Sequence, residues 1–125
     1  MNPAFILLWM IMMHIVDDYY LQGILAKMKQ KQWWENNAPE SLYKHDYIIA
    51  LLMHAFSWTF SIMLPIAFHI GFDISLKFGI IFVIDLSIHA FIDHLKANKK
   101  QINLIEDQLC HLLQIWMTFM LLVLV

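Results

Sequence analysis

The chain has 125 residues, of which 61% are hydrophobic and only 14% are charged, whereas about 25% of residues are charged in an average soluble domain. The formal net charge is -2 and every basic residue is a lysine, so the basic face of a nucleic-acid-binding domain is missing and nucleic acid is excluded as a partner. The apolar composition also excludes a disordered tail. The length suits one domain, and the single cysteine excludes an intrachain disulfide. Three glycines and three prolines are too few for a turn-rich β-protein.

Four segments are long and apolar enough to be membrane-spanning helices, which need about 20 mostly apolar residues. In chain order they cover about residues 4–26, 47–70, 74–95 and 104–125. The second contains no Asp, Glu, Lys or Arg, and neither the second nor the fourth shows the polar stripe of a soluble helix. We therefore expect an all-α, four-transmembrane-helix bundle that forms a single integral membrane domain over residues 1–125.

The first connection, residues 27–46, is expected to lie at the membrane interface. Trp33, Trp34 and Tyr43 occur there among lysines. Aromatic rings of this kind are enriched at the level of the lipid headgroups. The segment is therefore predicted to be an interfacial loop after the first helix.

Lysines mark one side of the predicted bundle. Seven of the eight flank the first and third connections, whereas only Lys77 lies near the second and none lies near the termini. Because lysine-rich loops stay on the cytoplasmic side, we expect a multi-pass protein of the inner (cytoplasmic) membrane. The lipid bilayer is then its partner, and both termini are expected on the non-cytoplasmic side.

Histidine and aspartate recur one turn apart inside three of the predicted spans, where a central charge costs roughly 2.5–3.5 kcal/mol. His14 precedes Asp17 and Asp18 by three and four residues, and Asp107 precedes His111 by four, so each pair lies on one helix face. On the third span, polar residues continue along one face at Asp85, His89, Asp93 and Lys96. The second span has a single histidine of this kind, His54.

One histidine from each span lies at a similar depth. At about 1.5 Å of rise per residue, His14, His54, His89 and His111 are all roughly 10–20 Å from the lysine-bearing ends of their helices. The four spans are therefore expected to bring their His and Asp residues into one layer in the cytoplasmic half of the bundle.

Imidazole and carboxylate groups are ligands that Zn²⁺, Mn²⁺ and Fe²⁺ accept in proteins. The layer therefore predicts a site for one or two divalent metal ions, with zinc as the first choice and manganese or iron as alternatives. The competing interpretation is that these residues form polar contacts between helices. The expected metal ligands are His14, Asp17, His54, His89, Asp93, Asp107 and His111.

The spacing of these residues resembles an uncharacterised family of small bacterial and phage membrane proteins of unknown function. The shared patterns are H-x-x-D at 14–17 with Gln22, the lone His54, H-x-x-x-D-x-x-K at 89–96 and D-Q-x-x-H at 107–111. More loosely, the chain is similar to membrane-bound metal-dependent hydrolases. The resemblance implies that the seven expected ligands form a shared polar centre, surrounded by Gln22, Lys27, Lys96 and Gln108. Asp18 stands where the family often has an aromatic residue, which leaves open whether Asp17 or Asp18 binds the metal.

These residues favour a metal-dependent hydrolase that acts at the cytoplasmic leaflet. A bound cation would activate water and polarise a phosphoryl or carbonyl oxygen. Asp17 or Asp107 would accept a proton, and Lys96 and Lys27 would face the headgroup phosphates. The expected substrate is phosphorylated or lipid-linked.

Two other functions remain open. The same residues would suit a metal or proton transporter, with Asp85 as a further station deeper in the membrane. They would also suit a small bacterial or phage membrane effector in which a metal only stabilises the bundle. The sequence is compatible with a homo-oligomer and does not determine the oligomeric state.

Overall fold

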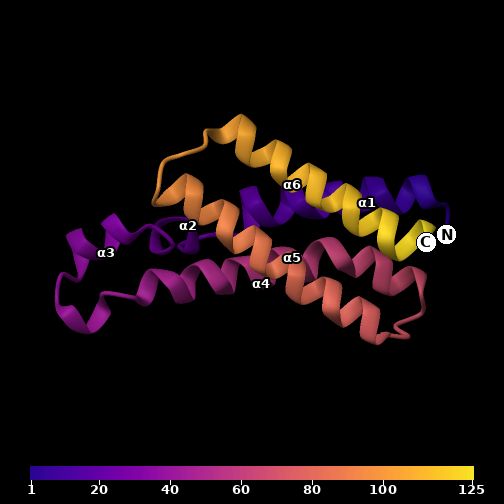
Figure 1. The fold of residues 1–125 in the computed structure, drawn as a ribbon, viewed down its shortest axis with the longest axis horizontal. Coiled ribbons are helices and arrows are strands. Elements are labelled where there is room, and N and C mark those ends of the chain that lie inside the picture. Colours follow the sequence, from indigo (N-terminus) through magenta and orange to yellow (C-terminus); the bar gives the residue numbers. More distant parts are fainter.

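Helices make up all the regular secondary structure of the chain, which a computed structural model describes over residues 1–125. Four long helices run along the molecule, and the two short helices α2 and α3 lie at one end of it, with the connection between α5 and α6 (Figure 1). Both termini and the turn between α4 and α5 lie at the other end. The helices are α1 (Pro3–Val16), α2 (Leu25–Met28), α3 (Lys31–Asn37), α4 (Asp46–His69), α5 (Leu76–Ala97) and α6 (Leu104–Phe119).

Two π-helical turns extend the first and the last of the long helices, α1 and α6. Asp17–Leu21 continues α1 and Met120–Leu124 continues α6. A 3₁₀ turn, Ser41–Tyr43, precedes α4. With these extensions the four helical segments long and apolar enough to cross a membrane are Pro3–Leu21, Ser41–His69, Leu76–Ala97 and Leu104–Leu124. The all-α prediction with four membrane-length helices is therefore confirmed.

The first long helix ends at Leu21, earlier than residue 26, where the sequence pattern placed its end. Gly23 adopts a φ of +56°, in the left-handed region, and turns the chain before α2 begins at Leu25. Glycine is suited to this conformation because it has no Cβ. The apolar run continues past the turn, so hydrophobicity alone does not reveal where the helix stops.

Polar caps fix where three of the long helices begin. The side chain of Asn2 accepts a hydrogen bond from the N–H of Ala4 at 2.8 Å, and Ser75 accepts one from Phe78 at 3.2 Å. Asn103 and Glu106 form a reciprocal capping box at the start of α6. These side chains satisfy N–H groups that have no partner within the helix.

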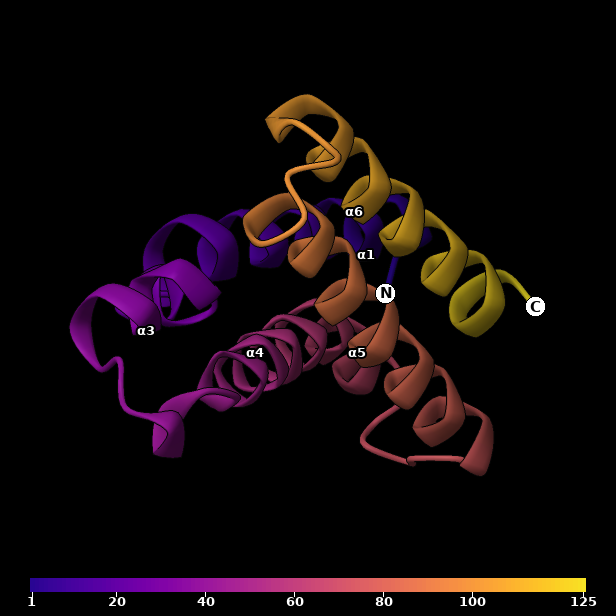
Figure 2. The same ribbon diagram turned by 60° about the vertical axis from the view of Figure 1, so that its left-hand side comes forward.

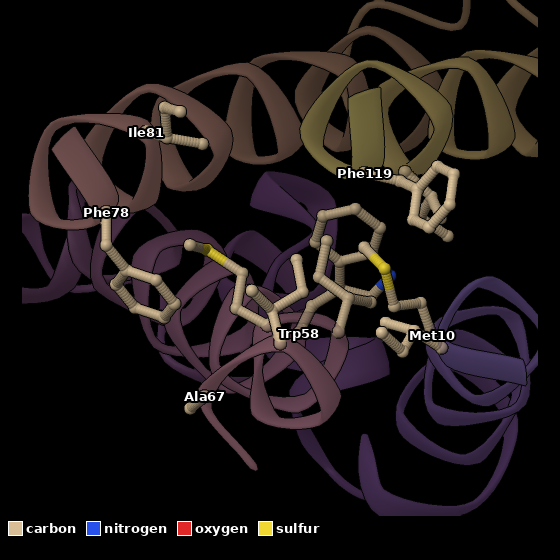
Figure 3. Packing of buried hydrophobic residues seen from close by; sticks show 11 residues of the cluster. Met10, Trp58, Ala67, Phe78, Ile81 and Phe119 are labelled. Atoms are coloured by element: carbon tan, nitrogen blue, oxygen red, sulfur yellow. The ribbon is translucent and has the colours of Figure 1, made fainter. Parts of the chain in front are cut away.

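The long helices pack as a ring in which α1 and α5 each contact both α4 and α6. Figure 2 shows α5 and α6 side by side, joined by the short connection after α5. The half of the bundle nearest the termini is filled by an apolar cluster, in which Trp58 lies near Met10 and Phe119 (Figure 3). The cluster consists of Ile6, Met10, Trp58, Ile62, Met63, Ile66, Ala67, Phe78, Ile81, Ile115 and Phe119.

The lysine-rich end is held together by Asn98, the residue that caps the C-terminus of α5. Its amide nitrogen donates to the carbonyl of Lys29 at 3.0 Å, and its amide oxygen accepts from the N–H of Lys31 at 2.6 Å. The segment between α2 and α3 is thereby fixed against the end of α5. The predicted interfacial segment thus has defined structure and is tied to the bundle.

Two glycine substitutions should have opposite effects on stability. Replacing Gly23 by alanine forces a Cβ into the left-handed region and should lower the free energy of unfolding by about 1 kcal/mol. Gly79→Ala, inside α5 and with open space around the new Cβ, should be neutral or stabilising by up to about 1 kcal/mol. Reversible unfolding in detergent micelles measures both. Equal effects of the two substitutions would contradict the turn at Gly23.

Candidate metal centre

Four histidines, one from each long helix, meet in the half of the bundle that the apolar cluster leaves free. His14, His54, His89 and His111 are all buried, with at most 2% of each residue exposed. The ring centroids of His89 and His111 are 4.1 Å apart, and those of His54 and His89 are 5.1 Å apart. The structure therefore brings together the histidine layer that the spacing predicts.

The π-helical turn after α1 directs two consecutive carboxylates into this layer. On a regular α-helix adjacent side chains point about 100° apart, yet Asp17 and Asp18 both reach His54. Asp17 Oδ1 lies 3.6 Å from Nδ1 of His54, and Asp18 Oδ1 lies 3.2 Å from Nε2. The two carboxylates thus flank opposite nitrogens of one ring. Such π-helical turns occur frequently at functional sites.

The first possible donor set surrounds Nε2 of His54. This atom lies 3.2 Å from Asp18 Oδ1, 3.2 Å from His89 Nε2 and 3.4 Å from Asp93 Oδ2. Ligands held at about 2.0–2.1 Å from a tetrahedral zinc ion are about 3.3 Å from one another. These separations therefore match the spacing of ligand atoms around a small divalent cation.

The second possible donor set is His89, Asp93 and His111, which shares His89 with the first, and Asp107 lies beside it. His111 Nε2 is 3.2 Å from Asp93 Oδ1 and 3.3 Å from Asp107 Oδ1. Asp93 therefore presents one oxygen to each set. The residue groups whose donor atoms lie close enough to hold a metal ion are Asp18, His54 and His89, and His89, Asp93 and His111.

The charges in the layer do not balance within the protein. Two lysines reach it: Lys29 Nζ lies 2.8 Å from Asp93 Oδ2, and Lys96 Nζ lies 3.0 Å from Asp107 Oδ2. When the four carboxylates of Asp17, Asp18, Asp93 and Asp107 are ionised and the histidines neutral, two negative charges remain. Buried charge without a partner is strongly unfavourable. One divalent cation would neutralise the layer.

His14 belongs to the layer but lies outside both donor sets. The indole N–H of Trp58 lies 2.8 Å from Nδ1 of His14, and the Nε2 of His14 lies 2.9 Å from Gln108 Oε1. Because an indole N–H can only donate, Nδ1 accepts and Nε2 carries the proton. Both nitrogens are therefore used within the protein, in contrast to the metal-ligand role expected for His14.

The hydrogen bond from His14 also determines how the amide of Gln108 is oriented toward the donor sets. Its oxygen accepts from His14, so its amide nitrogen donates, at 3.3 Å to Asp18 Oδ2 and at 3.1 Å to Asp107 Oδ2. The amide thus holds one carboxylate of the first set and the carboxylate beside the second. Partners of this kind fix the orientation of ligands in metal sites.

Asp17 lies behind His54 rather than among the possible donors. Its Oδ2 accepts hydrogen bonds from Ser57 at 2.6 Å and Ser61 at 3.1 Å, and its Oδ1 faces His54 Nδ1. Asp17 can therefore orient the ring, whereas Asp18 occupies the position of a ligand. The sequence left the choice between these two aspartates open.

Asp85 forms a separate polar group one turn along α5 from His89. Thr118 donates to Asp85 Oδ2 at 2.6 Å, and Gln114 donates to Oδ1 at 3.1 Å. Neither donor set includes Asp85. Cys110 is half-buried and also belongs to neither set.

The chain belongs to the family DUF3307. This family is described as proteins of unknown function, and it matches residues 6–125. No curated protein and no solved structure matches the chain. The family match covers the four long helices except the first three residues of α1, so the histidine layer lies entirely within the DUF3307 region.

Lys29 is the residue of this DUF3307 site that the sequence did not single out. Lys27 was expected beside the centre, but it is exposed, and Lys29 contacts Asp93 instead. Lys27, Lys29 and Lys31 alternate along one short segment, so their chemistry does not distinguish them. Lys29 rather than Lys27 reaches Asp93 because Asn98 fixes the backbone of Lys29 against α5.

Removing the indole N–H of Trp58 should disturb the centre through His14. Trp58→Phe leaves Nδ1 of His14 buried without a donor, and we expect the free energy of unfolding to fall by about 1–3 kcal/mol. Trp116→Phe, at a half-exposed tryptophan, should change it by less than about 0.5 kcal/mol. In the unaltered protein, ¹⁵N NMR should show His14 protonated at Nε2 only. A proton on Nδ1 would contradict the proposed directions of the two hydrogen bonds of His14.

Proposed function

We propose that this DUF3307 chain is a multi-pass membrane protein with a divalent metal centre that hydrolyses a phosphorylated or lipid-linked substrate. The observation that carries the proposal is the pair of donor sets joined through Asp93, with separations suited to metal ligands. The first set offers His54, His89, Asp18 and Asp93. The second offers His89, Asp93 and His111, and Asp107 lies 3.3 Å from His111.

The two sets differ in how complete they are. Structural zinc sites have four protein ligands, whereas catalytic sites have three and keep one position for water or substrate. The first set supplies four donors from the π-helical turn after α1, from α4 and from α5, and the second supplies three from α5 and α6. The second set is therefore the better candidate for the reacting position, and zinc is the ion that suits this mixture of imidazole and carboxylate best.

A cation bound there would polarise a phosphoryl or carbonyl oxygen and activate a water molecule. The residues of the chain would prepare the surroundings. Lys96 would hold Asp107 in place by its 3.0 Å ion pair and face developing negative charge at the mouth of the site. Gln108 would keep the carboxylates of Asp18 and Asp107 oriented. Asp17 would support His54, so among the aspartates expected to act in catalysis Asp107 is the one at the reacting position.

The cytoplasmic leaflet is the proposed location of the reaction. Seven of the eight lysines flank the connections at the end of the bundle where the donor sets lie, and this bias favours a cytoplasmic orientation of that end. Both termini would then lie on the opposite side. The apolar cluster at that opposite end makes a continuous polar path unfavourable, which counts against the transport alternative.

Metal content is the first test of the proposal. We expect the protein purified in detergent to contain at least one divalent ion per chain. His89→Ala and Asp93→Ala should abolish metal binding, because Asp93 contributes to both donor sets and His89 contacts both. His69→Ala and Asp73→Ala, near the opposite end of the bundle, are the matched controls and should retain the metal. Elemental analysis measures the ion, and a metal-free unaltered protein would refute the centre.

A second test separates catalysis from a purely structural metal. Lys96→Gln and Asp107→Asn should lower kcat by about 100-fold or more on a phosphate ester that the protein cleaves, since each acts at the reacting position. The first donor set contains neither residue, so its ion should remain bound. Hydrolysis assays on a panel of phosphate esters, with circular dichroism as the folding control, give the result. Unchanged kcat in both variants would refute the roles of Lys96 and Asp107, and cleavage of none of the esters would favour the structural-metal alternative.

A further inference from the structure

A cleft of about 390 Å³ opens at the lysine-rich end of the bundle, directly over Asp93. Its walls come from the segment around α2 and from the C-terminal end of α5, and they carry three of the eight lysines of the chain. These are Lys29, Lys96 and Lys100. The cleft is large enough for a small ligand group, and Asp93 connects it to both donor sets.

The three lysines are not equivalent. Lys29 and Lys96 are each paired with a carboxylate of the histidine layer, at 2.8 Å and 3.0 Å. Lys100 has no acidic partner within ion-pair distance. Its positive charge is therefore available to a ligand in the cleft.

The backbone of Lys100 adopts a conformation that is unfavourable for residues other than glycine. Its φ is +52°, in the left-handed region that glycine usually occupies after a helix. The following N–H, of Gln101, donates to the carbonyl of Leu95 at 3.0 Å and closes the end of α5. A side chain retained in a conformation that disfavours side chains is a feature of functional sites.

The charge of the groups around the cleft determines when an anion can bind there. Asp93 lines the cleft, and the polar layer beneath it holds four carboxylates against two ion-paired lysines. An anion is therefore repelled from the protein alone. Once a divalent cation balances the carboxylates that Lys29 and Lys96 leave unpaired, Lys100 is the remaining positive charge at the cleft, and an ammonium group is a good donor to phosphate oxygens.

We propose that this cleft binds the phosphate group of a phosphate monoester, and that it does so only when the metal centre is loaded. The inference rests on the metal centre proposed above and names the substrate group of that site. Lys100 supplies the free charge, and Lys29 and Lys96 supply the remaining donors while they hold Asp93 and Asp107. Lys100 is thus a specificity-determining residue for the anionic group.

Inorganic phosphate is the probe for the test. Calorimetric titration of zinc-loaded protein in detergent should show saturable binding, and protein stripped with a chelator should show none. Lys100→Gln should weaken phosphate binding about tenfold, the value expected for one charge-assisted hydrogen bond, while its zinc content stays unchanged. Lys99→Gln removes the same charge from the adjacent exposed residue outside the cleft and should leave binding unchanged.

The outcomes separate the inference from the metal centre on which it rests. A protein that binds zinc but not phosphate refutes the cleft and leaves the metal centre intact. Phosphate binding to metal-free protein, or equal losses in Lys99→Gln and Lys100→Gln, also refutes the cleft. A protein that binds no zinc refutes the metal centre itself.

The origin of the phosphate group is distinguished by two further ligands. A water-soluble alkyl phosphate and a long-chain lipid phosphate in phosphatidylcholine vesicles are compared for metal-dependent binding. Tighter binding of the lipid assigns the cleft to a headgroup, and equal binding assigns it to a free phosphate monoester. Binding of both without metal would overturn the proposal.

Discussion

The concentration of negative charge inside an apolar bundle is the constraint on which the rest of this structure depends. Asp17, Asp18, Asp93 and Asp107 are gathered among four helices whose outer faces are largely hydrophobic. In a bilayer no water is available from the sides, so each carboxylate must be satisfied from within. Serine hydroxyls, one glutamine amide, two lysines and the histidine rings surround them. Four carboxylates thus share the layer with two ion-paired lysines.

Trp58 lies at the boundary between the apolar cluster and the histidine layer and contacts both. Its ring belongs to the apolar cluster and stacks on His89 with 4.1 Å between ring centroids. Its N–H donates to His14 and so sets the direction of every hydrogen bond from His14 through Gln108 to the carboxylates. A single side chain thereby provides both packing and orientation. The direction of these hydrogen bonds is fixed because an indole can donate but not accept.

The division of the bundle into an apolar half and a polar half also limits what the protein can do. Polar groups extend only as far as Asp85, which Gln114 and Thr118 satisfy, and apolar side chains fill the interior beyond. The opposite end of the layer opens to the cleft that Lys29, Lys96 and Lys100 line. A site reached from one side suits a reaction at one leaflet better than passage through the membrane.

The sequence by itself determined the four membrane-length helices and the depth of their histidines, because hydrophobic length and helical rise are local properties. It also placed His89, Asp93 and His111 in one layer, since the depths of their helices' histidines match. Only the tertiary structure distinguished Asp18 from Asp17, because α4 places Ser57 and Ser61 against Asp17 and Nε2 of His54 against Asp18. It likewise assigned His14 to Trp58 and Gln108, and it selected Lys29 rather than Lys27 through Asn98. These choices depend on contacts between residues far apart in the chain, which periodicity within one helix cannot specify.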